Sequence, residues 1–466
     1  MFDIYKLGGN NKMEAKEHVN VLIENSRIAQ KEFESYSQEK VDEAVRAIGK
    51  AVYDNGEILA RLAVDETKMG RYEDKIVKNK GKSKAVWNKL KGVKSRGILR
   101  YIEEEGLVEV GKPIGVIGAI CPSTNPTMTP MQNAMIVLKG GNSLIVCPHP
   151  SGKISGKKTV DVMNEALTKT GAPKNLIQIV EEPSIEISKL VMELADVCIS
   201  TGGPGMVKAA YSSGKPAFGV GPGNLQCLID TDVDIKEVVP KVVKGRTYDR
   251  GVLCTCEQSA IIPVDRYDAY IAALIDQGAY YVEKEEELEA LRKTMWEDGR
   301  VNRAVVGATP VTIAKLAGIV VPEDTKLLVV KIKGTGKEEV LSREKMCPVL
   351  AAYSYSTWEE AVNIANTNLL NEGQGHSVVI HSNTKKNIEY AAVVLPVSRF
   401  AVNQIGSSGL GGSFANGLKP TGTLGCGSWG NNSLSGNLWF NHLINTSLIA
   451  YEIPGKYVPT DEEIWN

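Results

Sequence analysis

Two cysteines lie two positions apart in the stretch YDRGVLCTCEQS, residues 248–259. A cysteine thiolate is intrinsically very nucleophilic, and it needs a positively charged or hydrogen-bonding environment to form. Cys254 follows a short apolar run and precedes polar residues, and Arg250 lies four positions before it. The stretch therefore indicates Cys254 as a candidate nucleophile. An inert buried thiol is the alternative interpretation for Cys254, and also for Cys256.

Other polar residues follow apolar runs at positions where they could assist covalent chemistry. Asn125 in CPSTNPT precedes a proline, and its amide could donate a hydrogen bond to an oxyanion; a turn-forming asparagine is the alternative. His376 in EGQGHS opens a predicted strand, although a lone histidine is more often structural. Glu344 in SREKMCPV is a loop carboxylate, a type that is usually solvated.

Two glycine-rich turns suggest a phosphate site. STGGPGMVKAA, residues 200–210, follows a predicted strand and opens a predicted helix, where glycines allow close backbone approach and the helix N-terminus favours an anion. GVGPGN, residues 219–224, is a second such turn. Neither matches GxGxxG, and a purely structural turn is the alternative. Together with the strand–helix alternation they predict a dinucleotide site.

The order of apolar segments predicts an α/β protein. The first hundred residues carry apolar side chains at three- and four-residue spacing, which is typical of helices. Short apolar strands then alternate with helices, and the alternation resumes after residue 255, which predicts parallel, doubly wound sheets with the ligand at the strand carboxyl ends. The tail from about Gly406 is rich in Gly, Ser and Asn, but interleaved tryptophans predict an ordered loop near a site.

Length and charge limit the partner classes. The 466 residues predict two large domains, and a formal net charge of −1 argues against nucleic acid or an anionic membrane as partner. The one dense basic stretch, residues 78–96, is expected to cover a solvated helix face. Eight cysteines without paired ligand spacing predict no metal site and no disulfide framework. With no secretion signal or long apolar run, we expect a cytoplasmic protein with reduced thiols.

The motifs occur in an order that resembles the CoA-acylating aldehyde dehydrogenases. The resemblance covers the chain from about residue 20 to its end, in the segments PSTNP, PHP, STGGPGMVKAAYSSGKPAFGVGPGN, RGVLCTCEQS, EKMCPV, GHS and TLGCGSWGNNS. It is closest to the CoA-dependent succinate semialdehyde dehydrogenase branch, and next to the aldehyde dehydrogenase half of bifunctional aldehyde-alcohol dehydrogenases.

The resemblance implies an aldehyde dehydrogenase fold with three parts. A Rossmann-like nicotinamide cofactor domain would span residues 1–240, a catalytic domain 241–430, and a C-terminal segment 431–466. A hairpin at about residues 95–113, together with that segment, would hold subunits together in a homodimer or homotetramer. The N-terminal stretch MFDIYKLGGNN leaves open an association with a compartment.

The resemblance also implies roles for individual residues. Cys254 matches the catalytic cysteine, whereas Cys256 falls where relatives carry a small residue. Asn125 matches the amide that forms the oxyanion hole with the Cys254 backbone N–H, and His376 matches a histidine near the acyl-transfer site. Glu344 matches the glutamate that holds the nicotinamide ribose. Further cofactor contacts are implied for Pro148, His149, Thr201, Gly202, Gly203, Gly205 and Gly221.

One difference from hydrolytic aldehyde dehydrogenases predicts the acyl acceptor. Those enzymes carry a water-activating glutamate where this chain has GVGPGN, which contains no carboxylate. Coenzyme A is then the expected co-substrate, because a thiolate attacks an acyl-cysteine without a built-in base. The stretch SGKISGKK, residues 151–158, contains three lysines and no acid, which favours NADP over NAD as the cofactor, with ordinary surface lysines as the alternative.

Two arginines suggest an anionic aldehyde. Arg250 replaces an asparagine common in relatives, and Arg246 matches an arginine of the succinate semialdehyde branch. Guanidinium groups would bind the carboxylate of succinate semialdehyde or the sulfonate of sulfoacetaldehyde; contact with solvent or a neighbouring subunit is the alternative for Arg250. Acetaldehyde or propionaldehyde is the second hypothesis. A catalytically silent scaffold is the third, and the presence of Cys254 and Asn125 argues against it.

Overall fold

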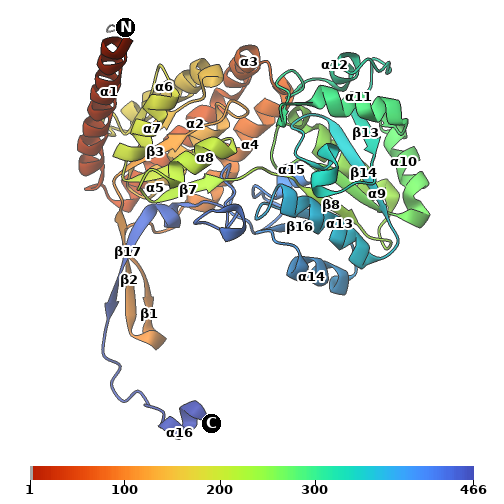
Figure 1. Cartoon of the computed structure of the whole chain (residues 1–466). Coiled ribbons are helices and arrows are strands. Elements are labelled where there is room, and N and C mark those ends of the chain that lie inside the picture. The colour runs from red at the N-terminus through yellow and green to blue at the C-terminus, as the bar shows by residue number, and fades with distance from the viewer. Residues whose placement is uncertain (1–3) are drawn as a thin grey trace.

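Four helices precede the first strand, as the apolar spacing predicts (Figure 1). The apolar residues of the second helix recur at positions 41, 45, 48 and 52 and are buried, and its N-cap Ser37 accepts a hydrogen bond from the Lys40 amide. The computed structural model describes residues 4–466 and bounds these helices as α1 (Ile4–Phe33), α2 (Gln38–Asp54), α3 (Gly56–Thr67) and α4 (Tyr72–Leu90).

Five parallel strands form the sheet of the first lobe in the order β5-β4-β3-β6-β7. The chain runs outward from β3 to β5 and then returns to the other side of β3 as β6, so its direction of winding reverses between β3 and β6. A doubly wound sheet binds its ligand at such a reversal, at the carboxyl ends of the strands. The elements are β3 (Val116–Ile120), α5 (Met128–Lys139), β4 (Ser143–Cys147), α6 (Lys153–Lys169), β5 (Ile177–Ile179), α7 (Ile185–Leu194), β6 (Val197–Thr201), α8 (Pro204–Tyr211) and β7 (Ala217–Val220).

Seven parallel strands form the sheet of the second lobe in the order β10-β13-β14-β9-β8-β15-β16. Helices follow most of its strands, as the resumed alternation predicts. The elements are β8 (Gln226–Ile229), α9 (Ile235–Thr247), β9 (Ser259–Pro263), α10 (Tyr267–Asp276), β10 (Ala279–Val282), α11 (Glu285–Met295), α12 (Pro310–Leu316), β13 (Leu327–Lys331), β14 (Val349–Tyr355), α13 (Trp358–Asn371), β15 (Val378–His381), α14 (Lys385–Val394) and β16 (Phe400–Val402), with a small hairpin of β11 (Trp296–Glu297) and β12 (Arg300–Val301).

The change of lobe comes earlier than residue 240. Strand β7 ends at Val220 in the first sheet, and β8 begins at Gln226 in the second. A boundary at residue 240 would cut helix α9, whose apolar face packs into the core of the second lobe. The lobe boundary therefore differs from the expected residue 240, because the GVGPGN turn, which has the pattern of a cofactor-binding turn, is the connection between the lobes.

The tail returns to the first lobe. After α15 (Gly406–Gly409), the glycine-rich stretch is ordered, as the tryptophans predict, and its Leu438 and Trp439 are buried in the core of the first lobe. Strand β17 (Ile444–Ala450) then pairs with the hairpin of β1 (Gly97–Ile102) and β2 (Leu107–Pro113), and α16 (Asp461–Trp465) ends the chain. The three strands form an arm that projects from the body of the molecule (Figure 1). No helix within residues 4–466 is long and apolar enough to cross a membrane.

Candidate active site

Cys254 lies on the short segment between α9 and β9, where the chain leaves a 3-10 turn at Tyr248–Gly251. It is partly exposed, whereas the other seven cysteines are buried. Its side chain lines a cavity of about 310 Å³ that Asn125 lines from the loop after β3. The structure therefore brings together the two residues that the sequence indicates for covalent chemistry.

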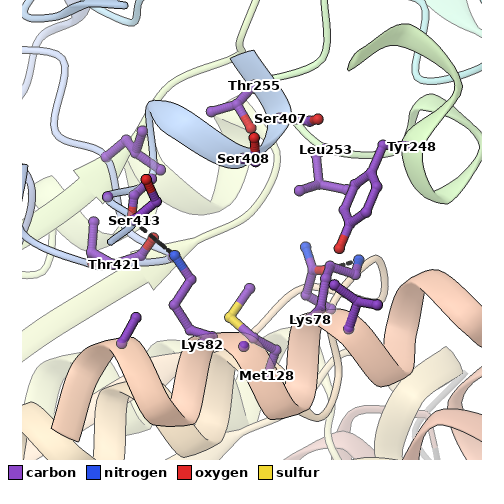
Figure 2. Close-up of a pocket in the computed structure, with 18 of the residues that line it drawn as sticks. Lys78, Lys82, Met128, Tyr248, Leu253, Thr255, Ser407, Ser408, Ser413 and Thr421 are labelled. Carbon is purple, nitrogen blue, oxygen red and sulfur yellow. Dashed lines mark hydrogen bonds between the residues drawn. The ribbon is translucent and has the colours of Figure 1, made fainter. Parts of the chain in front are cut away.

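The cavity lies between the two lobes. Figure 2 shows Lys78 and Lys82 on helix α4 and the nearby Met128 along one side, with Leu253 and Thr255 on the other. Residues of the glycine-rich tail complete the lining, among them Ser407, Ser408, Gly411, Ser413 and Thr421. Of the described residues that line it, none is an aspartate or a glutamate, and the charged ones are Lys78, Lys82 and Lys84.

The backbone just before the nucleophile adopts an uncommon conformation. Asp249 and Arg250 have φ angles of +49° and +53°, in the left-handed region that costs an L-residue roughly 1–2 kcal/mol. The Asp249 side chain is fully buried; its carboxylate accepts from the Arg71 amide at 2.7 Å and from Lys75 Nζ at 3.1 Å, and it pairs with Lys78. These contacts offset the cost of the turn and join this segment to the first lobe.

The same ion-pair cluster orients the Asn125 amide. Lys78 Nζ also donates to Asn125 Oδ1, which fixes the oxygen of that amide toward helix α4. The Asn125 Nδ2 group is left with one distant partner, Thr124 Oγ1 at 3.5 Å. An amide held in this way can donate both of its hydrogens elsewhere, and a developing oxyanion in the cavity is a suitable acceptor.

The buried surroundings keep Cys254 protonated at rest. Burial raises the pKa of the Cys254 thiol well above its usual range, and the Glu344 carboxylate raises it further, whereas the Arg399 guanidinium lowers it. Cys256 is fully buried, its thiol lies 3.7 Å from the Tyr248 carbonyl oxygen, and burial raises its pKa to about 12. Cys254 is therefore the cysteine available to a substrate, and Cys256 is part of the packing.

The second glycine-rich turn packs directly against Cys254. A Cβ at Gly223 would lie 2.1 Å from the Cys254 carbonyl oxygen, so any larger residue would displace Cys254. A Cβ at Gly221 would lie 3.6 Å from Cys426 Sγ on the returning tail. Glu344 is also in this region; burial and the Glu372 carboxylate raise its pKa to about 8, and the Gly223 amide lowers it. Gly223 and Cys426 were not singled out from the sequence.

The predicted cofactor residues collect at the carboxyl ends of β4 and β6. Pro148 and His149 follow β4, and Thr201 ends β6. Gly202 and Gly203 precede α8, where a Cβ added to Gly203 would meet no heavy atom within 4 Å. This open approach to a helix N-terminus fits the pyrophosphate of a nicotinamide dinucleotide. Of the other predicted contacts, Gly205 lines a separate hollow.

The lysines after β4 have acidic neighbours that the local sequence does not contain. Lys153 pairs with Glu182 at 2.5 Å, and Lys157 lies 3.1 Å from Asp161 and 3.5 Å from Glu181. The two glutamates follow β5, which lies beside β4. The lysines that favour NADP are thus partly neutralised in the folded protein by acidic residues outside the stretch 151–158.

The remaining predicted residues do not line the Cys254 cavity. His376 is fully buried, its Nδ1 lies 2.7 Å from Ser377 Oγ, and burial lowers its pKa to about 3. Arg246 is fully buried and donates to the Cys347 carbonyl oxygen. Arg250 lines a different cavity of about 550 Å³ that also contains Glu323 and Asp324.

The basic stretch at residues 78–96 is not simply a solvated helix face. Lys75 and Lys78 are buried, and Lys82 faces the cavity. Helix α4 is covered here because the Asp249 segment of the second lobe packs on it. The spacing of four residues between Lys78 and Lys82, which places them on one helix face, was the sequence signal for this shared location.

Comparison with known proteins gives a consistent match. The model of the aldehyde dehydrogenase family matches residues 8–286. The chain is 52% identical to succinate-semialdehyde dehydrogenase (acetylating) of Clostridium kluyveri, over 98% of this chain and 100% of that protein. It is 40% identical to a sulfoacetaldehyde dehydrogenase of Acholeplasma, over 95% of this chain and 92% of that protein.

Solved structures resemble the whole chain. An acetylating aldehyde dehydrogenase from Geobacillus thermoglucosidasius superposes with a TM-score of 0.92 at 37% identity, covering 99% of this chain and 100% of the other. A propionaldehyde dehydrogenase from Rhodopseudomonas palustris, solved with bound CoA and an acylated cysteine, gives a TM-score of 0.83 at 26% identity, covering 93% and 96%.

Iodoacetamide should alkylate Cys254 before any other cysteine of the native protein, because the other seven are buried. Since the pKa of this thiol is raised, the reactive thiolate is the minor form at neutral pH, and the rate should rise about tenfold per pH unit between pH 7 and 9. Peptide mass spectrometry with a Cys254→Ser control measures this. A rate that levels off below pH 8, or earlier labelling of Cys426, would contradict the assignment.

Asp249→Asn should lower the free energy of unfolding by about 3–5 kcal/mol, because it leaves Lys75 and Lys78 buried without their carboxylate. Asparagine tolerates the left-handed backbone, so the turn itself is not penalised. The matched control is Asp161→Asn, which breaks an exposed pair with Lys157 and should cost less than about 1 kcal/mol. Equal effects in denaturant unfolding would show that the Asp249 cluster is not a stabilising contact.

Proposed function

We propose that this chain, which belongs to the aldehyde dehydrogenase family, oxidises succinate semialdehyde to its CoA thioester, with NADP or NAD as the cofactor. The reaction is reversible, so reduction of the acyl-CoA is equally available. One observation carries the proposal: Cys254 and Asn125 line a single cavity whose described lining contains no carboxylate. Such a cavity can form an acyl-cysteine and has no carboxylate on its walls to activate water against it.

Covalent chemistry begins at Cys254. Its thiolate adds to the aldehyde carbon, and the Asn125 amide stabilises the negative charge that develops on the aldehyde oxygen, with the Cys254 backbone N–H as the second donor. The residues at the carboxyl ends of β4 and β6 would hold NADP or NAD, which supplies the hydride acceptor when bound. The acyl group then remains on Cys254 as a thioester.

The residues that line the cavity favour CoA over water as the acyl acceptor. Hydrolysis requires a general base beside the attacking water, and the described cavity lining offers hydroxyls and lysines but no carboxylate. The CoA thiol, once ionised, is nucleophilic without such a base. The relative with bound CoA and an acylated cysteine supports this order of events. Glu344, with its pKa raised to about 8, lies behind Gly223 and does not line the cavity.

We favour succinate semialdehyde over three other aldehydes as the substrate. The relative at 52% identity is named for it, whereas the sulfoacetaldehyde relative is 40% identical. The lysines on the cavity lining favour either of these anions over acetaldehyde or propionaldehyde, which offer no charge to bind. Sulfoacetaldehyde is the second candidate on the same grounds.

The test is nicotinamide absorbance with NADP or NAD, each with and without CoA, against succinate semialdehyde, sulfoacetaldehyde and acetaldehyde. We expect cofactor reduction that requires CoA and is fastest with succinate semialdehyde. Cys254→Ser should abolish it, and Asn125→Ala should lower kcat about 100- to 1,000-fold, the usual cost of one oxyanion donor. Equal turnover without CoA would contradict the acyl acceptor, and a preference for acetaldehyde would contradict the substrate.

We further propose that the arm of β1, β2 and β17 joins two subunits. Its outer strands are largely exposed on both faces, and Tyr101 and Leu448 are 64% and 61% exposed. A three-stranded sheet gains independent stability only when a face is covered, which a second copy of the chain would provide.

Replacing both arm residues, as Tyr101→Lys/Leu448→Lys, should convert a dimer or larger assembly into a monomer, because two charges would be buried at the interface. Light scattering after size-exclusion chromatography measures the mass. Val320→Lys, a change at an 89% exposed apolar residue of the second lobe, should leave the assembly intact. A wild-type monomer at micromolar concentration would contradict the proposal.

A further inference from the structure

Three lysines line the Cys254 cavity, and their charges are compensated differently. Lys78 pairs with Asp249 and donates to Asn125. Lys84 is exposed and lies over the Tyr53 ring, 5.6 Å from its centroid. Lys82 Nζ contacts only backbone oxygens, Gly411 O at 2.9 Å and Thr421 O at 3.3 Å. Among the residues that the structure describes, no carboxylate pairs with Lys82.

Lys82 is therefore a cation that has no carboxylate partner among the described residues. Burial lowers the pKa of its amine to about 8, with no opposing carboxylate, so the charged form is held at some cost. Two backbone carbonyls from the returning tail orient the amine but do not neutralise it. Figure 2 shows the Lys82 side chain rising from α4 toward Ser413 and Thr421 on that tail. An anion bound in the cavity would recover the lost interaction.

The position of Lys82 along α4 matches the length of a four-carbon substrate. Lys82 lies one helical turn beyond Lys78, a separation of about 6 Å along the axis. Lys78 holds Asn125, which marks the place of the aldehyde oxygen. In succinate semialdehyde three carbon–carbon bonds of about 1.5 Å separate the two end carbons, which spans roughly 4 Å when extended. Adding a hydrogen bond of about 2.8 Å gives a span of roughly 7 Å, which is comparable with that axial separation.

We propose that Lys82 binds the terminal carboxylate of the aldehyde substrate and thereby determines the preference for a four-carbon ω-oxo acid. The hydroxyls of Ser407 and Ser408 line the same cavity as neutral donors. This inference rests on the proposed function and names the residue that selects its substrate. It assigns to α4 the substrate-binding role expected for Arg250 and Arg246, neither of which lines this cavity.

The test compares succinate semialdehyde with butanal, which has the same carbon count without the carboxylate. Lys82→Met keeps most of the side-chain volume and removes the charge. We expect kcat/KM for succinate semialdehyde to fall about 10- to 100-fold, as for one lost charge-assisted hydrogen bond, while that for butanal changes less than threefold. Lys82→Arg should retain most of the preference. Lys89→Met, on the same helix but outside the cavity, is the matched control for net charge.

A second readout needs no variant. The ratio of kcat/KM for succinate semialdehyde to that for butanal should fall as the pH rises above about 8, because Lys82 then loses its proton. Taking the ratio cancels the titration of Cys254, which affects both substrates. The titratable groups on the cavity walls besides Lys82 are Lys78, Lys84, Tyr248 and Cys254, so no carboxylate titration enters this range.

Each outcome decides the proposal. An unchanged ratio in Lys82→Met, or an equal loss with both aldehydes, would overturn it, since the second pattern marks a purely structural role. A rise in KM for CoA alone would assign Lys82 to a CoA phosphate and overturn it as well. If Lys82→Met fails to fold, the pH dependence of the wild-type ratio and the Lys82→Arg variant still decide. Wild-type enzyme without CoA-dependent turnover of any aldehyde would instead refute the proposed function.

Discussion

The buried carboxylate of Asp249 is the contact on which the rest of the site depends. It comes from the second lobe, while its partners Arg71, Lys75 and Lys78 come from the first. A buried carboxylate without partners would be strongly destabilising, so the lobes are held where these partners can reach it. Because Lys78 also contacts Asn125, the charge that joins the lobes orients the amide that we propose as the oxyanion donor. The cavity between the lobes is therefore preorganised by the same interaction that positions its walls.

Local sequence signals predicted the strands, the helices and the pair Cys254 and Asn125, because hydrophobic period and motif order are properties of neighbouring residues. The lysines of α4 were mispredicted for a physical reason. A basic helix stretch has the same pattern whether it faces water or a second lobe, and only the partner segment distinguishes the two. That segment, around Asp249, lies more than a hundred residues further along the chain. Asp249 and the α4 lysines are far apart in the sequence, so only the folded structure reveals that they pair.

Arg250 illustrates how the backbone conformation decides where a side chain points. Its place four residues before Cys254 suggested a substrate contact, but proximity in sequence does not fix where a side chain points. Two successive left-handed residues turn Asp249 into the interior and leave Arg250 lining a different cavity. The neighbouring acid, to which the sequence analysis gave no role, carries the structural function. No local propensity signals this, because the conformation is imposed by contacts from α4.

The charge composition of the cavity links its two chemical properties. A carboxylate on these walls would activate water against the acyl-cysteine, and it would also neutralise Lys82. The described lining contains lysines and hydroxyls but no carboxylate, so it avoids both effects. In the proposed reaction, protection of the thioester and selection of an anionic aldehyde both depend on the absence of a carboxylate from the described lining. Evolution of a hydrolytic enzyme from this site would need a new base and, at the same time, a new way to hold the substrate carboxylate.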